Sequence, residues 1–202
     1  MKTPLLILLF LIPLLTPMTG SAAPRGQIVA IDNSVFVAMV NPSIEDCVCI
    51  QHEENWCWAA CIHMILWYNG IRERQSDIVA HVYGASYNWT ASGNEIAEAF
   101  DGWNGFSVRF FKSKTAQSFI NEIAAGHPLI IGSGEHACLL THIYYQKTSN
   151  GALVPFKVIV INPSLGKEEV MDWDDFFSSI NTIVSFLPVI RTRLKPDKGQ
   201  FL

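Results

Sequence analysis

An apolar run that begins at Cys57 limits the possible folds of this chain more than any other feature. Residues 57–67 contain no Gly or Pro, and Asn69-Gly70 follows as a stop signal, so the run predicts a helix. Its residues are apolar on nearly every face, which is typical of a helix inside a protein. The fold must therefore place other elements around this helix.

Cys57 occupies the first position of that helix, within the block Asn55-Trp56-Cys57-Trp58-Ala59-Ala60. A thiol reacts as its thiolate, and the free N–H groups and positive dipole end of a helix N-terminus stabilise this anion. The position therefore indicates a nucleophilic cysteine. A structural cysteine at the start of a core helix is the alternative, because unpaired cysteine is among the most buried residue types.

Gln51 precedes the cysteine by six residues. In an irregular loop, its amide N–H can face the same substrate oxygen as the backbone N–H of Cys57. Two such donors form an oxyanion hole. The alternative is a solvated loop glutamine.

His136 follows the glycine-rich turn Gly132-Ser133-Gly134 and opens a predicted strand over residues 136–146. A histidine at the start of a strand is well placed to reach a sulfur on an adjoining helix as general base and then general acid. His142 is the rival on the same strand. Because their spacing is even, both side chains point to one face of the strand. They are roughly 20 Å apart, so only one of them can act as the base for the cysteine. The glycine flank favours His136.

Asn162 ends the apolar strand predicted over residues 156–161 and stands immediately before Pro163. An asparagine there can accept a hydrogen bond from the imidazole and fix the orientation of the ring. The alternative is a simple turn, because Asn-Pro commonly opens one.

These residues together resemble the papain-like cysteine peptidases, in the compact bacterial form shared by leader-processing peptidases and secreted effector proteases of plant pathogens. The resemblance covers roughly residues 45–188. It rests on Gln51, the block at residues 55–60, Gly134-Glu135-His136-Ala137 and Val160-Ile161-Asn162-Pro163.

The resemblance implies a role for each candidate residue. Cys57 is then the nucleophile, His136 the acid and base, and Asn162 the orienting residue. Gln51 becomes the oxyanion donor. We expect the neighbouring residues Trp56, Trp58 and Gly134 to contact the substrate, and the loop residues Trp89 and Trp103 are further candidates for lining the cleft.

Two features depart from the larger family members, and one departs from the compact members. Cys57 and His136 are only 79 residues apart, against about 130 or more in plant and lysosomal enzymes. Many compact bacterial members carry Asp where this chain has Asn162, so Glu135 or another residue is an alternative orienter. Trp56 replaces the small residue that precedes the cysteine in the plant enzymes, which suits the compact branch.

The remaining pattern predicts an α+β fold, with the helices mostly before the strands. Ser76 and Asn94 are candidate helix caps. Papain-like architecture implies a helical half that carries the nucleophile, an antiparallel sheet half that carries base and orienter, and an active site in the cleft between them. Further helices are predicted at residues 76–83, 94–100, 115–125 and 172–180, and further strands at 107–111, 129–131, 168–171 and 183–186.

The N-terminus has the pattern of a secretory signal peptide over residues 1–23. Lys2 precedes an apolar stretch at residues 5–15, and Gly20-Ser21-Ala22-Ala23 supplies small residues for cleavage. The pattern predicts a secreted or periplasmic protein, and the resemblance implies that it is bacterial, with one peptidase domain over residues 24–202. A retained membrane anchor is the alternative, although the stretch is short for a span.

Composition narrows the range of partners and cofactors. The formal charge is −4, which argues against nucleic acid or an anionic membrane surface as a partner. The chain keeps five cysteines after the signal, so an oxidising compartment would leave one thiol free. A zinc site is a poor fit, because neither paired Cys-x-x-Cys knuckles nor a His-x-x-x-His arm is present. We expect no metal or other cofactor. The five cysteines are Cys47, Cys49, Cys57, Cys61 and Cys138.

The predicted function is a secreted cysteine peptidase that hydrolyses peptide or protein substrates through an acyl-enzyme intermediate. One alternative keeps the chemistry but changes the acceptor, as in an amidase, transpeptidase or acyltransferase. Another is a papain-like binding protein that has lost catalysis.

Overall fold

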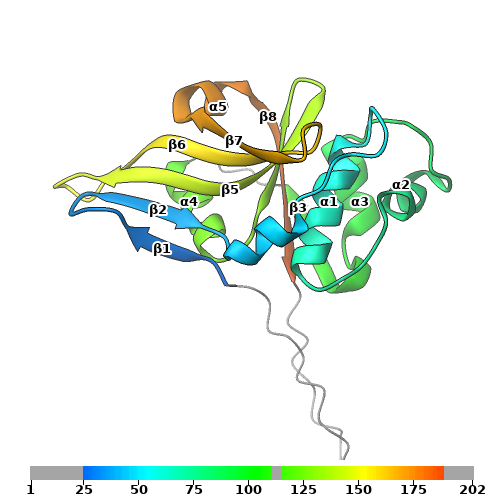
Figure 1. The fold of residues 1–202 in the computed structure, drawn as a ribbon, viewed down its shortest axis with the longest axis horizontal. Helices are drawn as coiled ribbons and strands as arrows, with labels where there is room; N and C mark the ends of the chain where they lie inside the picture. Colours follow the sequence, from blue (N-terminus) through cyan, green and yellow to red (C-terminus); the bar gives the residue numbers. More distant parts are fainter. Residues whose placement is uncertain (1–24, 111–114, 189–202) are drawn as a thin grey trace, which may run out of the picture.

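The computed structural model describes residues 25–110 and 115–188 (Figure 1). The predicted signal peptide at residues 1–23 lies outside these ranges, as does Phe111 of one predicted strand. None of the helices in these ranges combines the length and apolar character needed to span a membrane.

Eight strands form one antiparallel sheet, and the helices gather mainly at one end of it (Figure 1). The helical elements are η1 (Pro42–Cys47), α1 (Cys57–Tyr68), α2 (Gln75–Tyr83), α3 (Gly93–Phe100), η2 (Trp103–Gly105), α4 (Ala116–Ala124) and α5 (Trp173–Ser179). The strands are β1 (Gln27–Ala30), β2 (Val35–Met39), β3 (Phe106–Phe110), β4 (Leu129–Ser133), β5 (His136–Lys147), β6 (Leu153–Asn162), β7 (Lys167–Asp172) and β8 (Ile180–Pro188).

The sheet branches at β5, which has three partners. Its first half pairs with β4 and its second half pairs with β2, while β6 runs along its other edge. Strands β2 and β4 therefore share one edge of β5, in the order β1-β2-β5-β4-β8-β3. On the other edge of β5, the sheet is extended by β6 and then β7. This arrangement curls the sheet around the end where β5 begins. The predicted α+β class and antiparallel sheet are confirmed.

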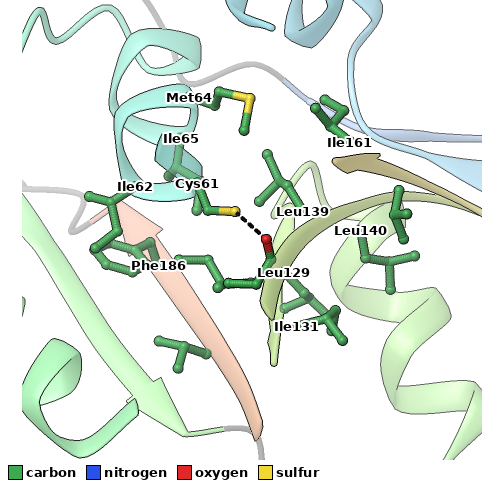
Figure 2. Close-up of a cluster of buried hydrophobic side chains, with 14 of the residues drawn as sticks. Cys61, Ile62, Met64, Ile65, Leu129, Ile131, Leu139, Leu140, Ile161 and Phe186 are labelled. Carbon is green, nitrogen blue, oxygen red and sulfur yellow. Dashed lines mark hydrogen bonds between the residues drawn. The ribbon is translucent and has the colours of Figure 1, made fainter. Parts of the chain in front are cut away.

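Helix α1 is the central element that the sequence predicts. Ten of its twelve residues are buried, and it packs against β5, η1 and α2. Figure 2 shows its inner face meeting Leu129, Leu139 and Phe186 from the sheet. The Cys61 thiol also reaches the backbone carbonyl of Ala137 on β5, at 3.7 Å. The first turn of α1 is thereby held against the first residues of β5.

Two predicted helix starts are wrong. Ser76 lies inside the first turn of α2, which begins at the buried Gln75. Helix α3 is capped by Ser92 rather than Asn94: the Ser92 side chain accepts the Glu95 N–H, and the Glu95 carboxylate accepts the Ser92 N–H. This reciprocal capping box satisfies two end groups at once, which Asn94 alone would not do.

The N-terminal strands β1 and β2 are absent from the sequence-based prediction. Strand β1 is exposed along its whole length and pairs only with β2. Strand β2 pairs with the second half of β5. Strands therefore precede as well as follow the helices, and β5 is enclosed by segments from both ends of the chain.

The hydroxyl of Ser185 on β8 is buried and has no hydrogen-bond partner among the described residues. An unpaired buried hydroxyl is destabilising. We expect Ser185→Ala to raise the free energy of unfolding by about 1 kcal/mol, measured by denaturant unfolding. Ser178→Ala is the control, because Ser178 is exposed and should shift stability by less than about 0.5 kcal/mol. A loss of stability in Ser185→Ala would contradict this account.

Candidate active site

Cys57 is the first residue of α1 and is only 5% exposed. Trp56 takes the N-cap position and supplies no side-chain hydrogen bond to the helix end. The first-turn N–H groups thus have no side-chain cap, and the positive end of the helix dipole lies at the sulfur. The local sequence therefore creates a site that favours an anion at Cys57.

His136 is placed by a two-residue turn between β4 and β5. Ser133 and His136 are paired across this turn, and Gly134 adopts a φ of +59°, a conformation that favours glycine. His136 is therefore the first residue of β5, beside the N-terminal turn of α1. There its imidazole interacts with the Cys57 thiol.

Asn162 contacts the other side of the same imidazole. It is the last residue of β6, the strand next to β5, and its Oδ1 lies 2.9 Å from His136 Nε2. The same oxygen accepts the Ser164 N–H at 3.0 Å. The Asn162 amide nitrogen donates to Glu169 Oε2 at 2.7 Å. Because these contacts assign the oxygen side of the amide to His136, Nε2 carries the proton and Nδ1 is available to the thiol.

The electrostatics of this group favour a charged thiolate and imidazolium. Burial raises the pKa of Cys57, but hydrogen bonding to His136 and to backbone groups outweighs it, so the net pKa lies below its ordinary value. The pKa of His136 rises to about 10, because it hydrogen-bonds first to Cys138 and then to Cys57 and Asn162. The hydrogen bonds around both groups thus favour their charged forms.

Gln51 is linked to the Asn162 turn rather than isolated in solvent. Its backbone N–H donates to Pro163 O at 2.9 Å, and its Oε1 accepts the Ser164 hydroxyl at 2.9 Å. The amide nitrogen donates to the backbone carbonyls of Glu53 (2.9 Å) and Glu54 (2.6 Å). Gln51 does not line the cleft that opens at Cys57 and His136.

Gln75 fixes the loop that carries Gln51. This α2 residue is only 1% exposed. Its side chain accepts the His52 N–H at 2.9 Å and donates to Ile50 O at 2.9 Å. The backbone on both sides of Gln51 is therefore hydrogen-bonded to the buried amide of Gln75. The sequence did not predict this role, because Gln75 is polar and gave no sign of being buried.

A cleft of about 560 Å³ opens at Cys57 and His136. Trp58 and Gly134 line it, as does Gly93, the first residue of α3. A Cβ on Gly93 would lie 2.6 Å from the Phe110 ring and 2.7 Å from Thr182 Cγ2. The close approach of α3 to the sheet across the cleft therefore depends on glycine at this position.

The lining of the cleft includes none of the predicted contacts Trp56, Trp89 and Trp103. Trp56 is buried. Its indole N–H donates to Tyr87 O at 2.9 Å, and that of Trp58 donates to Trp89 O at 3.1 Å. Asn55 donates two hydrogen bonds to Asn88, from its backbone N–H to Oδ1 and from its side-chain amide to the backbone carbonyl. The block around the cysteine is thus tied to the loop at residues 87–89.

The rival His142 is buried, and its Nδ1 lies 2.9 Å from the Thr141 hydroxyl. It does not line the cleft. All five cysteines lie in the described part of the chain and are free thiols. In that part, no group of three or more His, Cys, Asp or Glu side chains is arranged to hold a metal ion.

Comparison with known proteins identifies the family and the fold. The family model described as papain-like cysteine protease AvrRpt2 matches residues 41–180. No curated protein matches the chain. A double glycine motif protease from an AMS/PCAT transporter, solved in complex with the leader peptide, is similar in structure, with 18% identity and a TM-score of 0.51 over 70% of this chain and 91% of that one.

A second solved structure is the peptidase domain of Streptococcus ComA, a bi-functional ABC transporter. It has 15% identity and a TM-score of 0.48 over 69% of this chain and 96% of that one. The family match spans most of the sequence, and the first structure shares the fold. This chain therefore belongs to the family of the papain-like cysteine protease AvrRpt2, and it is a cysteine-type peptidase with a papain-like fold.

Proposed function

We propose that this chain hydrolyses peptide bonds with Cys57 as nucleophile, His136 as acid and base, and Asn162 as the orienting residue. One observation carries the proposal. His136 interacts with the Cys57 thiol and with Asn162 Oδ1, at the N-terminus of a buried helix and on the wall of a cleft. Nucleophile, base and orienter in mutual contact are the arrangement that covalent catalysis needs.

The proposed reaction begins when the Cys57 thiolate attacks the carbonyl carbon of a peptide bond. The C–N bond breaks as the His136 imidazolium gives its proton to the leaving amine, and a thioester remains on Cys57. Neutral His136 then takes a proton from water, whose oxygen attacks the thioester. The thiolate leaves, and the imidazolium is restored for the next cycle.

Gln51 is proposed to stabilise the oxyanion together with the Cys57 backbone N–H. Gln51 Oε1 accepts the Ser164 hydroxyl, so the amide nitrogen is the end of the side chain that can donate to another group. That nitrogen donates to the Glu53 and Glu54 carbonyls. A substrate oxygen must therefore replace one of these two bonds.

Peptides in an extended conformation are the proposed substrates. The structurally similar double glycine motif protease was solved with a leader peptide. The cleft here has backbone at Gly132 and Gly134 on one wall and the start of α3 on the other. An open cleft lined by glycines leaves room for an extended chain to lie along it.

Export to the periplasm or beyond a bacterial cell is also part of the proposal. It rests on the pattern of residues 1–23 in the sequence. The catalytic proposal does not depend on it.

Removal of either member of the thiol–imidazole pair should abolish turnover. We expect Cys57→Ala and His136→Ala to lower kcat by roughly 10⁴-fold or more on a peptide that the wild type cleaves, with unchanged circular dichroism. His142→Ala should remain within about threefold of the wild type if it folds. Retained activity in Cys57→Ala would exclude it as the nucleophile.

The pH dependence of Cys57 alkylation should reveal the ion pair without any substrate. The lowered pKa of Cys57 keeps the thiolate populated below its ordinary pKa, and the His136 pKa of about 10 keeps the imidazolium present above neutrality. We expect iodoacetamide, followed by peptide mass spectrometry, to label Cys57 rapidly at neutral pH. In His136→Ala, the loss of the imidazole leaves burial as the largest influence on the thiol, so the labelling should move to higher pH.

Cys47 and Cys49 are internal controls for that labelling. Burial raises the pKa of each thiol to about 11, so both should react only at high pH. Equal labelling of Cys57 and Cys49 at neutral pH would contradict the ion pair.

The oxyanion role of Gln51 predicts a specific kinetic change. We expect Gln51→Ala to lower kcat by roughly 10²-fold, because the missing donor acts on charge that develops in the transition state. The rate of Cys57 alkylation should stay near that of the wild type, since Gln51 does not contact the thiol. A change confined to KM would instead assign Gln51 to substrate binding.

A further inference from the structure

The Asn162 side chain is held at both ends. Its oxygen accepts from His136 Nε2 at 2.9 Å, and its nitrogen donates to Glu169 Oε2 at 2.7 Å. An ionised carboxylate only accepts hydrogen bonds, so it can contact the nitrogen end of an amide but not the oxygen end. Glu169 at the nitrogen end and the Ser164 N–H at the oxygen end therefore fix together which end of Asn162 faces the imidazole.

The register of β6 and β7 creates this contact. Glu169 is paired with Val160, two residues before Asn162 on β6. Residues two apart on a strand point to the same face, so Glu169 and Asn162 are diagonal neighbours on one side of the sheet. The adjacent Glu168 is paired with Ile161 and points to the opposite face.

Both side chains line a second, smaller hollow of about 200 Å³, distinct from the cleft at Cys57. His136 and Cys138 contribute to it as well, and its apolar lining includes Val160, Met171 and Phe176. Glu169 and Asn162 are both half-buried. Hydrogen bonds to a charged group gain strength where apolar side chains reduce the access of water.

We propose that Glu169 is a positioning residue for His136 that acts through Asn162, and that it explains why this chain has Asn rather than Asp at position 162. The proposal rests on the proposed catalytic function of Cys57 and His136. Without Glu169, the Asn162 amide can turn over and present its N–H₂ group to the imidazole. The nitrogen that faces Cys57 would then have to carry the proton when the ring is neutral, and it could not act as the base.

An aspartate at position 162 is incompatible with Glu169 for the same reason. Two ionised carboxylates cannot donate a hydrogen bond to one another, and at this distance their charges repel. Glutamine at position 169 removes this conflict, because its N–H₂ can donate to one oxygen of a carboxylate at position 162 while the other oxygen accepts from His136. Position 162 should therefore accept aspartate only when position 169 is glutamine.

The test uses four variants of the full chain: Asn162→Asp, Glu169→Gln, the double variant with both changes, and Glu169→Ala. We expect Asn162→Asp and Glu169→Ala to lower kcat by roughly tenfold with little change in KM, the lower end of what loss of an orienting partner costs. Glu169→Gln should lose only about threefold, because its oxygen can still accept from Asn162. The double variant should recover to within about threefold of the wild type, a clear departure from multiplied single effects.

Glu168→Gln is the matched control. It removes a neighbouring carboxylate on the same strand but on the other face, and kcat should not change. The rate of Cys57 alkylation at neutral pH is measured in every variant, because it reports the thiol–imidazole pair without a substrate. It should fall in Asn162→Asp and recover in the double variant. Thermal unfolding identifies any variant that fails to fold, and the near-isosteric exchanges at the two positions keep the test decisive if Glu169→Ala does not fold.

The outcomes separate this inference from the proposed function. If Cys57→Ala and His136→Ala are inactive but the effects of Asn162→Asp and Glu169→Gln simply multiply, the positioning role of Glu169 is overturned and the catalytic proposal stands. If wild-type Cys57 labels no faster than Cys49 at neutral pH, the catalytic proposal fails and the inference fails with it. Recovery of both kcat and alkylation in the double variant supports the inference.

Discussion

The packing of α1 against the first residues of β5 is the contact on which the rest of the site depends. Cys61 reaches the carbonyl of Ala137, and Cys57 stands one helical turn before Cys61 while His136 stands one residue before Ala137. The same apolar interface that stabilises the core therefore sets the distance and angle between thiol and imidazole. Residues on this face of the helix are almost entirely buried, so neither element can shift without opening the core. The proposed thiol–imidazole pair is thus held by hydrophobic packing rather than by a flexible loop.

Around that interface, buried and half-buried amides connect the loops that complete the site. Gln75 ties the backbone on both sides of Gln51, and the turn after β6 connects Gln51 to Asn162 through Pro163 and Ser164. Each of these amides has partners for both its donor and its acceptor end. Satisfied polar groups of this kind specify one arrangement, because any alternative leaves a group unpaired in a region with little water. Helical and sheet halves thereby become a single unit at the active site.

The sequence predicted those parts of the fold whose signals are local. An unbroken apolar run identified α1, and the glycine-rich turn before β5 marked His136. Strands β1 and β2 escaped detection because they are short, and β1 has no buried face to produce a pattern. Glu169 could not be selected among the acidic residues near it, because its contact with Asn162 depends on the register between two strands, which composition does not reveal. Gln75 had no apolar character to indicate its burial. The catalytic roles assigned to Gln51, Cys57, His136 and Asn162 remain predictions, although the structure brings the last three into contact.

The turn at Gly134 and Glu135 also restricts how the chain can change in length. One residue inserted there would shift the pairing of β4 and β5 by one position, and in a strand such a shift turns every following side chain to the opposite face. His136 would then point away from Cys57 even though the sheet could still form. The loop at residues 148–151, at the far end of β5, is restricted in the same way, because it joins β5 to β6 and so sets the register that brings Asn162 to His136. Insertions and deletions that shift the strand pairing should therefore be excluded from both ends of this strand.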